Sequence, residues 1–139
     1  MIDDVSLAEG LSYVWSYDNR YGMKASAYVS NTDYAAESWL ISPKFKLDAD
    51  ATLSYNQALN YFSSVESFAT EATVWIKEEG GSWEQLTGIT YPTSNSWNFA
   101  NSGEISLAEY TGKVVQIGFK YLSTTKAGTW EIQDIAITK

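Results

Sequence analysis

The chain has 139 residues, of which 9 are Lys or Arg and 17 are Asp or Glu, so its formal net charge is −8. It contains neither Cys nor His, which excludes disulfides, thiolate nucleophiles, His-dependent catalytic triads, and zinc, haem or iron–sulfur sites built on these residues. The acidic balance also argues against nucleic-acid binding, because neutralising phosphates requires clustered Lys and Arg. Carboxylate chemistry, a calcium site and pure binding remain.

Short segments of alternating apolar and polar residues, rich in β-branched and aromatic side chains, follow one another along the chain. They predict strands at residues 13–17, 23–29, 38–41, 52–61, 71–77, 83–87, 104–107, 114–122 and 130–138. Turn-forming residues separate these segments, as in Ser42-Pro43 and Glu78-Glu79-Gly80-Gly81. The only helical signal is a single turn at residues 107–110.

Many short strands at this spacing are typical of an antiparallel β-sandwich, so we expect an all-β jelly roll. No repeat, low-complexity tract or linker interrupts the pattern, and residues 1–139 are predicted to be one domain and a monomer. No apolar run approaches the ~20 residues of a membrane helix, so membrane insertion is not expected. Met1-Ile2-Asp3-Asp4 does not have the pattern of a signal peptide, and we expect the domain to be excised from a larger protein.

Several segments, taken in order, resemble a known group of bacterial modules. They include Glu37-Ser38-Trp39-Leu40-Ile41-Ser42-Pro43, Gly118-Phe119-Lys120-Tyr121 and Thr129-Trp130-Glu131-Ile132-Gln133-Asp134-Ile135. Together they resemble the choice-of-anchor J and cleaved-adhesin group of β-sandwich modules in secreted or surface proteins of Bacteroidetes-type bacteria. The resemblance implies a galactose-binding-like jelly roll without catalytic activity, extracellular or at the cell surface and tethered to enzyme or anchor domains.

The resemblance also implies structural calcium, which some members of the group hold. Glu37, at the start of one motif, and Asp134, on the last predicted strand, are the candidate ligands. The usual ending of the group has two acidic positions where this chain has Gln133-Asp134, so one carboxylate is missing. Calcium takes about six to eight oxygen ligands, and the alternative is that these carboxylates are simply solvated.

Trp75 lies on a predicted strand whose two faces differ. Val74 and Ile76 share one face of residues 71–77, which leaves Trp75 on the other face. A Trp that points outward is costly unless a loop covers it or a ligand uses it. We hold both interpretations open.

Asn56, Gln116 and Lys120 lie opposite the apolar faces of their own predicted strands. We expect these three side chains to share one outer sheet surface with Trp75. That surface would combine an aromatic platform with amide and ammonium donors, which suits the recognition of sugar rings and hydroxyl groups.

A second candidate surface lies at one end of the predicted sandwich, where loops carry Tyr61 and Trp97. Trp97 falls in the loop Ser94-Asn95-Ser96-Trp97-Asn98-Phe99, and loops on a rigid scaffold commonly carry recognition. The alternative is that Trp97 plugs the edge of the sandwich.

No buried carboxylate pair and no nucleophile elbow is recognisable, so we do not expect an enzyme. The leading hypothesis is a carbohydrate-binding module that binds a polysaccharide, of the β-glucan or xylan class, through aromatic platforms. The alternative is an adhesin-type module that binds protein, or a spacer without a ligand. The acidic charge disfavours strongly anionic glycans unless calcium bridges them.

Overall fold

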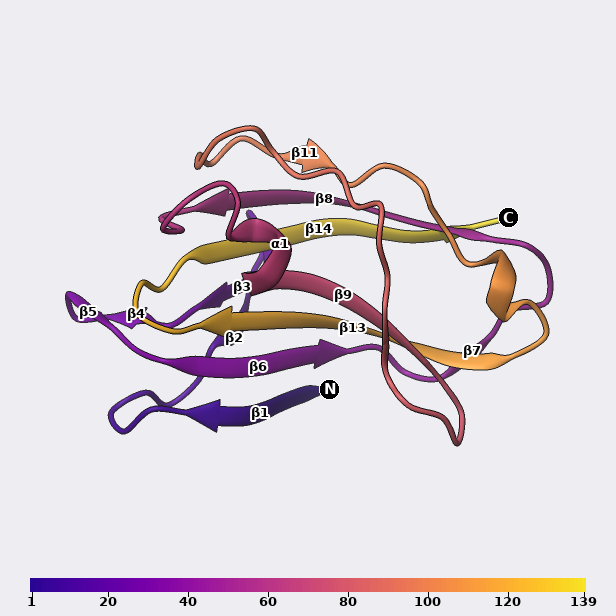
Figure 1. Ribbon diagram of the computed structural model, residues 1–139, viewed down its shortest axis with the longest axis horizontal. Helices are drawn as coiled ribbons and strands as arrows, with labels where there is room; N and C mark the ends of the chain where they lie inside the picture. Colours follow the sequence, from indigo (N-terminus) through magenta and orange to yellow (C-terminus); the bar gives the residue numbers. More distant parts are fainter.

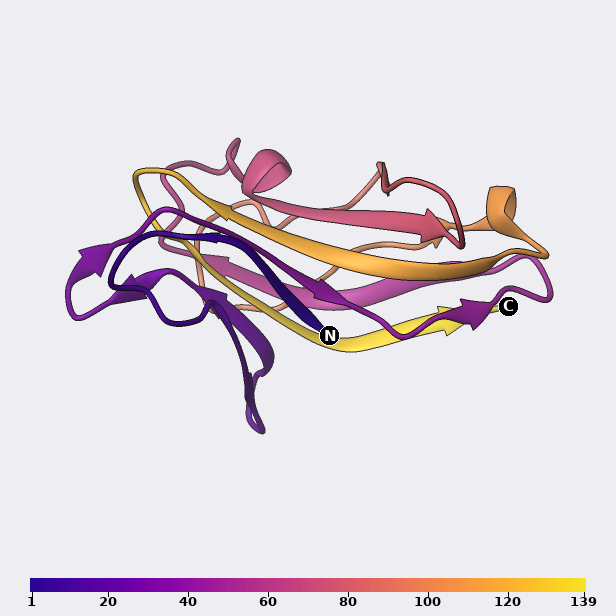
Figure 2. The ribbon, with the colours of Figure 1, turned by 90° about the horizontal axis from the view of Figure 1, so that it is seen from below.

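The computed structural model describes all 139 residues, Met1–Lys139, as two antiparallel β-sheets packed face to face (Figures 1 and 2). Sheet A has the strand order β1-β6-β13-β9-β10, and β7 also pairs with β13. Its strands are β1 (Ile2–Leu7), β6 (Ala36–Ile41), β7 (Phe45–Lys46), β9 (Ala72–Glu78), β10 (Glu84–Gln85) and β13 (Val114–Ser123).

Sheet B has the strand order β11-β8-β14-β3-β2, and β12 also pairs with β8. Its strands are β2 (Trp15–Asp18), β3 (Gly22–Ser26), β8 (Thr52–Asn60), β11 (Ala100–Asn101), β12 (Ile105–Ser106) and β14 (Thr129–Thr138). A separate hairpin joins β4 (Tyr28–Val29) to β5 (Thr32–Asp33), and the two short helices are α1 (Phe68–Glu71) and a 3₁₀ turn at Ala108–Tyr110. No helix of the structure is long and apolar enough to cross a membrane.

The core lies between the sheets because alternate residues of each strand face inward. On β13, for example, Ile117, Phe119 and Tyr121 are buried. They belong to one cluster of 26 buried apolar residues. Trp130 of β14 is fully buried, and its indole Nε1–H donates a hydrogen bond to Oε1 of Gln57 at 3.0 Å, which satisfies two polar groups at once.

The predicted all-β antiparallel sandwich is confirmed, and the predicted strands 52–61, 71–77, 114–122 and 130–138 correspond to β8, β9, β13 and β14. The predicted turn at residues 107–110 is the 3₁₀ helix. Strand β1 was not expected, because most of its side chains are exposed and it lies at the edge of sheet A. Predicted strand 83–87 shrinks to the two residues of β10.

Candidate functional site

Exposed aromatic side chains gather around two neighbouring pockets beside the outer face of sheet B. The first, which we call the Trp97 pocket, has a volume of ≈ 290 Å³ and is lined by Tyr21, Lys24, Trp97 and Glu131. The second, the Tyr28 pocket, has a volume of ≈ 280 Å³ and is lined by Tyr28, Asp33, Tyr61, Lys126 and Ala127. Each pocket therefore offers two aromatic rings, one carboxylate and one ammonium group.

The floor of the Trp97 pocket is formed by a cross-strand pair. Glu131 of β14 lies directly opposite Lys24 of β3, and both side chains face outward because their neighbours Trp130 and Ala25 face the core. Tyr21 stands in the turn between β2 and β3, where the Arg20 guanidinium lies 5.0 Å from the centre of its ring. This hairpin projects away from the sandwich on the outer side of sheet B, as Figure 2 shows, so it bounds the pocket on one side.

Glu131 is unusual because its side chain lies on an outer face and is nevertheless only 3 % exposed. This burial raises the pKa of the Glu131 carboxyl, and the nearby Lys24 ammonium partly opposes the shift. Neither group takes part in any of the three ion pairs of the protein. A hydroxyl group of a ligand could therefore donate to Glu131 and accept from Lys24 without breaking an existing ion pair.

The loop that carries Trp97 is fastened to the edge of β8 by backbone and amide hydrogen bonds. Ser96 N–H donates to the Leu59 carbonyl at 2.9 Å. The Asn95 side chain accepts from Phe62 N–H at 2.8 Å and donates to the Phe62 carbonyl at 3.2 Å. These bonds set the Trp97 ring edge-on to Tyr61, with centroids 5.6 Å apart and an interplanar angle of 81°.

Tyr61 also lines the Tyr28 pocket, so the aromatic contact between Tyr61 and Trp97 joins the two pockets into one surface. As predicted, Tyr61 and Trp97 lie together, and both side chains are about half exposed. Trp97 lines a pocket instead of filling the edge of the core.

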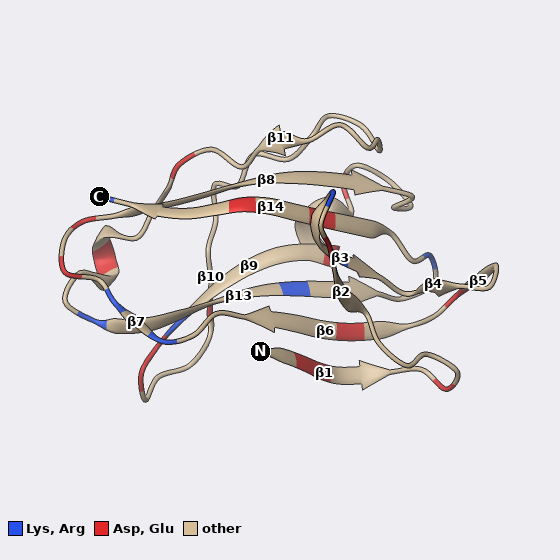
Figure 3. Cartoon of the chain, turned by 180° about the vertical axis from the view of Figure 1, so that it is seen from behind, with Lys and Arg blue, Asp and Glu red and all other residues tan.

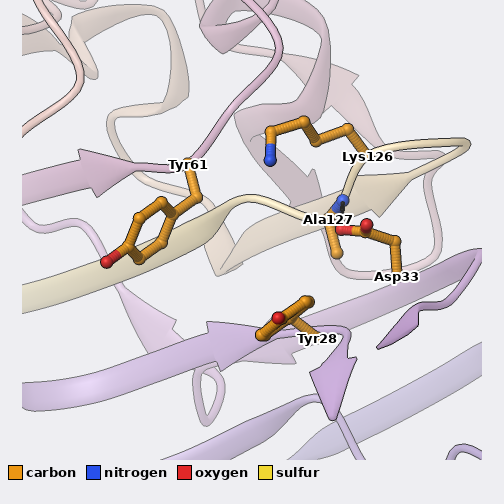
Figure 4. A pocket seen from close by; sticks show the side chains of 5 residues that line it. All are labelled: Tyr28, Asp33, Tyr61, Lys126 and Ala127. Carbon is orange, nitrogen blue, oxygen red and sulfur yellow. Dashed lines mark hydrogen bonds between the residues drawn. The ribbon is translucent and has the colours of Figure 1, made fainter. Parts of the chain in front are cut away.

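The Tyr28 pocket depends on a tight hairpin. Ser30 and Asn31 have φ values of 51° and 63°. Positive φ at both central residues is the mark of a type I′ turn, whose twist matches paired strands. The turn sets Tyr28 opposite Asp33, whose carboxylate accepts a hydrogen bond from Ala127 N–H at 2.9 Å. Figure 4 shows the rings of Tyr28 and Tyr61, with Lys126 and Asp33, around the same hollow.

Trp75 lies on the outer face of sheet A, whereas the two pockets lie beside sheet B. Its ring is half-buried and packs against Trp39, with centroids 5.6 Å apart, while Trp83 covers Trp39 from 5.1 Å. Gly118 makes room for this cluster, because a Cβ there would lie 2.8 Å from Cε3 of Trp39. The Trp75 indole N–H donates to Thr73 Oγ1 at 2.9 Å.

Gln116 and Lys120 share the outer face of sheet A with Trp75, as predicted, because β13 pairs with β9. Both side chains already contact other groups of the protein. Gln116 Nε2 donates to the Ser42 carbonyl at 3.1 Å, and Lys120 Nζ lies 5.5 Å from the centre of the Trp75 ring. A binding role for these three residues stays a prediction.

The expectation that Asn56 joins Trp75 is wrong, because β8 belongs to sheet B. Asn56 lies on the outer face of sheet B, two residues along β8 from Ala58, which pairs with Glu131. Its amide donates to Asp134 Oδ2 and accepts from Asn101 Nδ2, each at 3.0 Å.

The expectation that Glu37 and Asp134 share one calcium ion is also wrong. Glu37 lies in sheet A and accepts a hydrogen bond from the Trp39 indole at 3.0 Å, whereas Asp134 lies in sheet B against Asn56. No group of three or more acidic side chains is arranged to hold a metal ion. Calcium binding by the chain stays a prediction.

Of the residues that line the two pockets, only Tyr61 and Trp97 were predicted from the sequence. The seven that were missed are Tyr21, Lys24, Tyr28, Asp33, Lys126, Ala127 and Glu131. The alternation in Met23-Lys24-Ala25 and Trp130-Glu131-Ile132 does indicate that Lys24 and Glu131 face outward. What it could not indicate is that β3 and β14 are neighbours, which makes the two side chains a pair.

Solved structures with the same fold include modules of several kinds. The K3 cleaved adhesin domain of Lys-gingipain from Porphyromonas gingivalis W83 has a TM-score of 0.54 at 14% identity, over 84% of this chain and 73% of that one. A CBM4 protein has a TM-score of 0.51 at 13% identity, over 92% and 89%. A proposed sugar-binding protein from Bacteroides thetaiotaomicron VPI-5482 has a TM-score of 0.51 at 12% identity, over 99% and 86%.

No family model matches the chain, and no curated protein matches it. The structural neighbours thus show the jelly-roll fold, and one of them is a cleaved adhesin domain, the kind of module that the sequence resembles. The choice-of-anchor J part of that resemblance stays a prediction.

Proposed function

We propose that this chain is a non-catalytic module that binds a polysaccharide along the joined Trp97 and Tyr28 pockets. The observation that carries the proposal is the repeated composition of the two pockets, each with two partly exposed aromatic rings beside one carboxylate and one ammonium group. Aromatic rings stack on the apolar faces of sugar rings, and the charged groups orient the hydroxyls by hydrogen bonding. Two such pockets side by side suit a chain of repeating sugar units.

The pockets favour a neutral glycan of the β-glucan or xylan class. Lys24 stands against Glu131, and Lys126 lines the same hollow as Asp33, so neither pocket has a net charge of its own. A polyuronate would meet these carboxylates and a molecule of net charge −8. Neutral hydroxyl groups can donate hydrogen bonds to the carboxylate and accept them from the ammonium group of each pocket without adding charge.

A binding role without catalysis is supported by the carboxylates at the site. Glycoside hydrolysis uses two carboxyl groups about 5–9 Å apart across the bond that is cleaved. Each pocket has a single carboxylate among its lining residues. The module would serve to hold a larger extracellular or surface protein, with its enzyme or anchor domains, close to polysaccharide.

Affinity gel electrophoresis with soluble barley β-glucan and soluble xylan tests the proposal. We expect one of the two polysaccharides to retard the protein. Trp97→Ala should weaken binding about 30-fold, because truncating an aromatic side chain central to a contact surface costs about 2 kcal/mol. Tyr61→Ala should also weaken binding, since Tyr61 lines the Tyr28 pocket and its ring packs against the Trp97 ring.

Trp75→Ala is the matched control, because it removes a tryptophan from the opposite outer face. If the two pockets beside sheet B hold the glycan, this variant should bind as the wild type does. Loss of binding in Trp75→Ala with full binding in Trp97→Ala would instead place the site on sheet A. No retardation by any polysaccharide would favour the adhesin-type protein-binding alternative, and loss of retardation with EDTA alone would show that calcium is required.

A further inference from the structure

Two isoleucines at the end of β14 face the inside of the sandwich and yet remain exposed. Ile137 pairs in register with Leu53, whose side chain is fully buried, so both side chains point to the same inner face. Ile137 is nevertheless 38 % exposed, and Ile135 is 46 % exposed. Inward-facing apolar side chains are normally covered, so the sandwich is open at this edge.

The opening is an apolar groove between the two sheets. It has a volume of ≈ 270 Å³, and eight of its ten lining residues are hydrophobic. Sheet A contributes Leu40 and Phe45 to one wall, and Ile135 and Ile137 form the other. Ile117 is among the buried core residues that form its base.

The groove exists because β3 leaves β14 half-way along. The pairing between these strands ends at Met23 and Ile132, and the preceding residue, Gly22, directs the chain away from β14 with a φ of 89°. The turn of the β2–β3 hairpin therefore projects from the sandwich, as Figure 2 shows. Beyond Asp134, whose φ of 56° marks the irregularity in β14, the strand pairs with β8 on one side only. Its other edge, over residues 135–138, has no strand beside it.

Two lysines flank the groove in an otherwise acidic molecule. Lys44 and Lys46 flank Phe45, and no carboxylate is among the residues that line the groove. Lys44 contacts Glu79 at 3.0 Å in an exposed ion pair, which solvent screens, whereas Lys46 is exposed and takes part in no ion pair.

We propose that this groove binds an extended peptide strand of a partner protein, which adds to the free edge of β14. A strand satisfies both features of the site, because its backbone pairs with residues 135–138 while its alternate side chains enter the apolar groove. A lipid or a small apolar ligand would fill the groove and leave the strand edge unpaired. The lysines select a peptide with an acidic residue next to its apolar positions.

Three capped peptides of the pattern Asp-X-Thr-X-Thr-X-Asp, in which X is Val, Leu or Phe, test the proposal on the intact chain. Fluorescence polarisation with dye-labelled peptides measures affinity, and we expect a Kd below about 100 µM for one of them. Hydrogen exchange should slow at amides of residues 135–138. The same peptide with N-methyl groups at alternate residues should lose binding, because it cannot pair with the strand edge.

Ile137→Ser should weaken peptide binding about tenfold, because it removes one buried aliphatic contact from the complex. Val65→Ser is the matched control, since Val65 is 39 % exposed and lies outside the groove. Absence of binding by all three peptides at about 1 mM would overturn the proposal. So would equal binding of the N-methylated peptide, or a concentration-dependent dimer that Ile137→Ser abolishes, because these outcomes identify apolar adsorption and a second copy of the chain.

Discussion

At the scale of single residues, Glu71 carries the clearest pH dependence. This glutamate ends α1, is 9 % exposed, and has one buried carboxylate oxygen, Oε2, without a hydrogen-bond partner. Burial raises the pKa of its carboxyl above the ordinary value of 4.5. The folded state therefore holds the proton more tightly than the unfolded state does. The contribution of Glu71 to stability is fully present below pH 4.5 and is lost as the pH rises through the raised value.

We predict that Glu71→Gln raises the free energy of unfolding at pH 7 by on the order of 1 kcal/mol, since it removes a buried charge that lacks a partner. Urea unfolding followed by tryptophan fluorescence between about pH 4 and pH 7 measures the effect. The decline with pH should become shallower, although Glu131, whose carboxyl pKa is also raised by burial, keeps part of it. The exposed Glu66→Gln is the control. Identical pH slopes in Glu71→Gln and wild type would contradict the assignment.

At the scale of elements, the β2–β3 hairpin decides the shape of the Trp97 pocket. Gly22, at the start of β3, has a φ of 89°, and a Cβ there would overlap the backbone carbonyl oxygen of Ile132 in β14. We predict that Gly22→Ala forces β3 away from β14, which displaces Tyr21 and Lys24 from the pocket. Glycan affinity should fall about tenfold or more, and the free energy of unfolding should fall by about 1–3 kcal/mol.

Gly80→Ala is the control that separates the effect of backbone strain from the effect of displacing the hairpin. Gly80 lies in the turn between β9 and β10 with a φ of 82°, but a Cβ there would meet no atom within 4 Å. This variant should therefore lose some stability and keep its full affinity for glycan in isothermal titration calorimetry. If Gly22→Ala binds as tightly as Gly80→Ala, the hairpin is not part of the binding site.

The same scale shows what sequence patterns can and cannot predict in this chain. Alternation over seven to ten residues was enough for β9 and β13, because one face of each is buried along most of its length, and for β14, whose first four residues are buried. The predicted strands 83–87 and 104–107 shorten to the two-residue strands β10 and β12. The two-residue strand β11 pairs with β8, which is distant in the chain, so its own residues carry little signal. Side-chain direction was predictable for Trp75 and Lys120. The sequence did not show to which sheet β8 belongs, and Asn56 was therefore assigned to the wrong surface.

At the scale of the whole molecule, the charge of the chain and the charge of its pockets differ in a way that can be measured. The chain carries −8, and several of its Lys and Arg residues lie around β7 while the others are scattered over the molecule, as Figure 3 shows. Each pocket, in contrast, combines one carboxylate with one ammonium group. The long-range field of the molecule therefore repels anionic polymers. The affinity of the pockets for a neutral polymer, in contrast, should depend little on salt concentration.

We predict that affinity for a neutral β-glucan or xylan changes by less than about twofold between about 0.02 M and 0.5 M NaCl. Any weak binding of a polyuronate such as alginate should instead increase with salt, because added ions screen the repulsion from the −8 charge. Affinity electrophoresis at several salt concentrations, with EDTA present so that calcium cannot bridge acidic groups, measures both responses. A loss of neutral-glycan affinity of tenfold or more at high salt would mean that contacts between the charged side chains and the sugar hydroxyls, and not ring stacking, supply most of the binding energy.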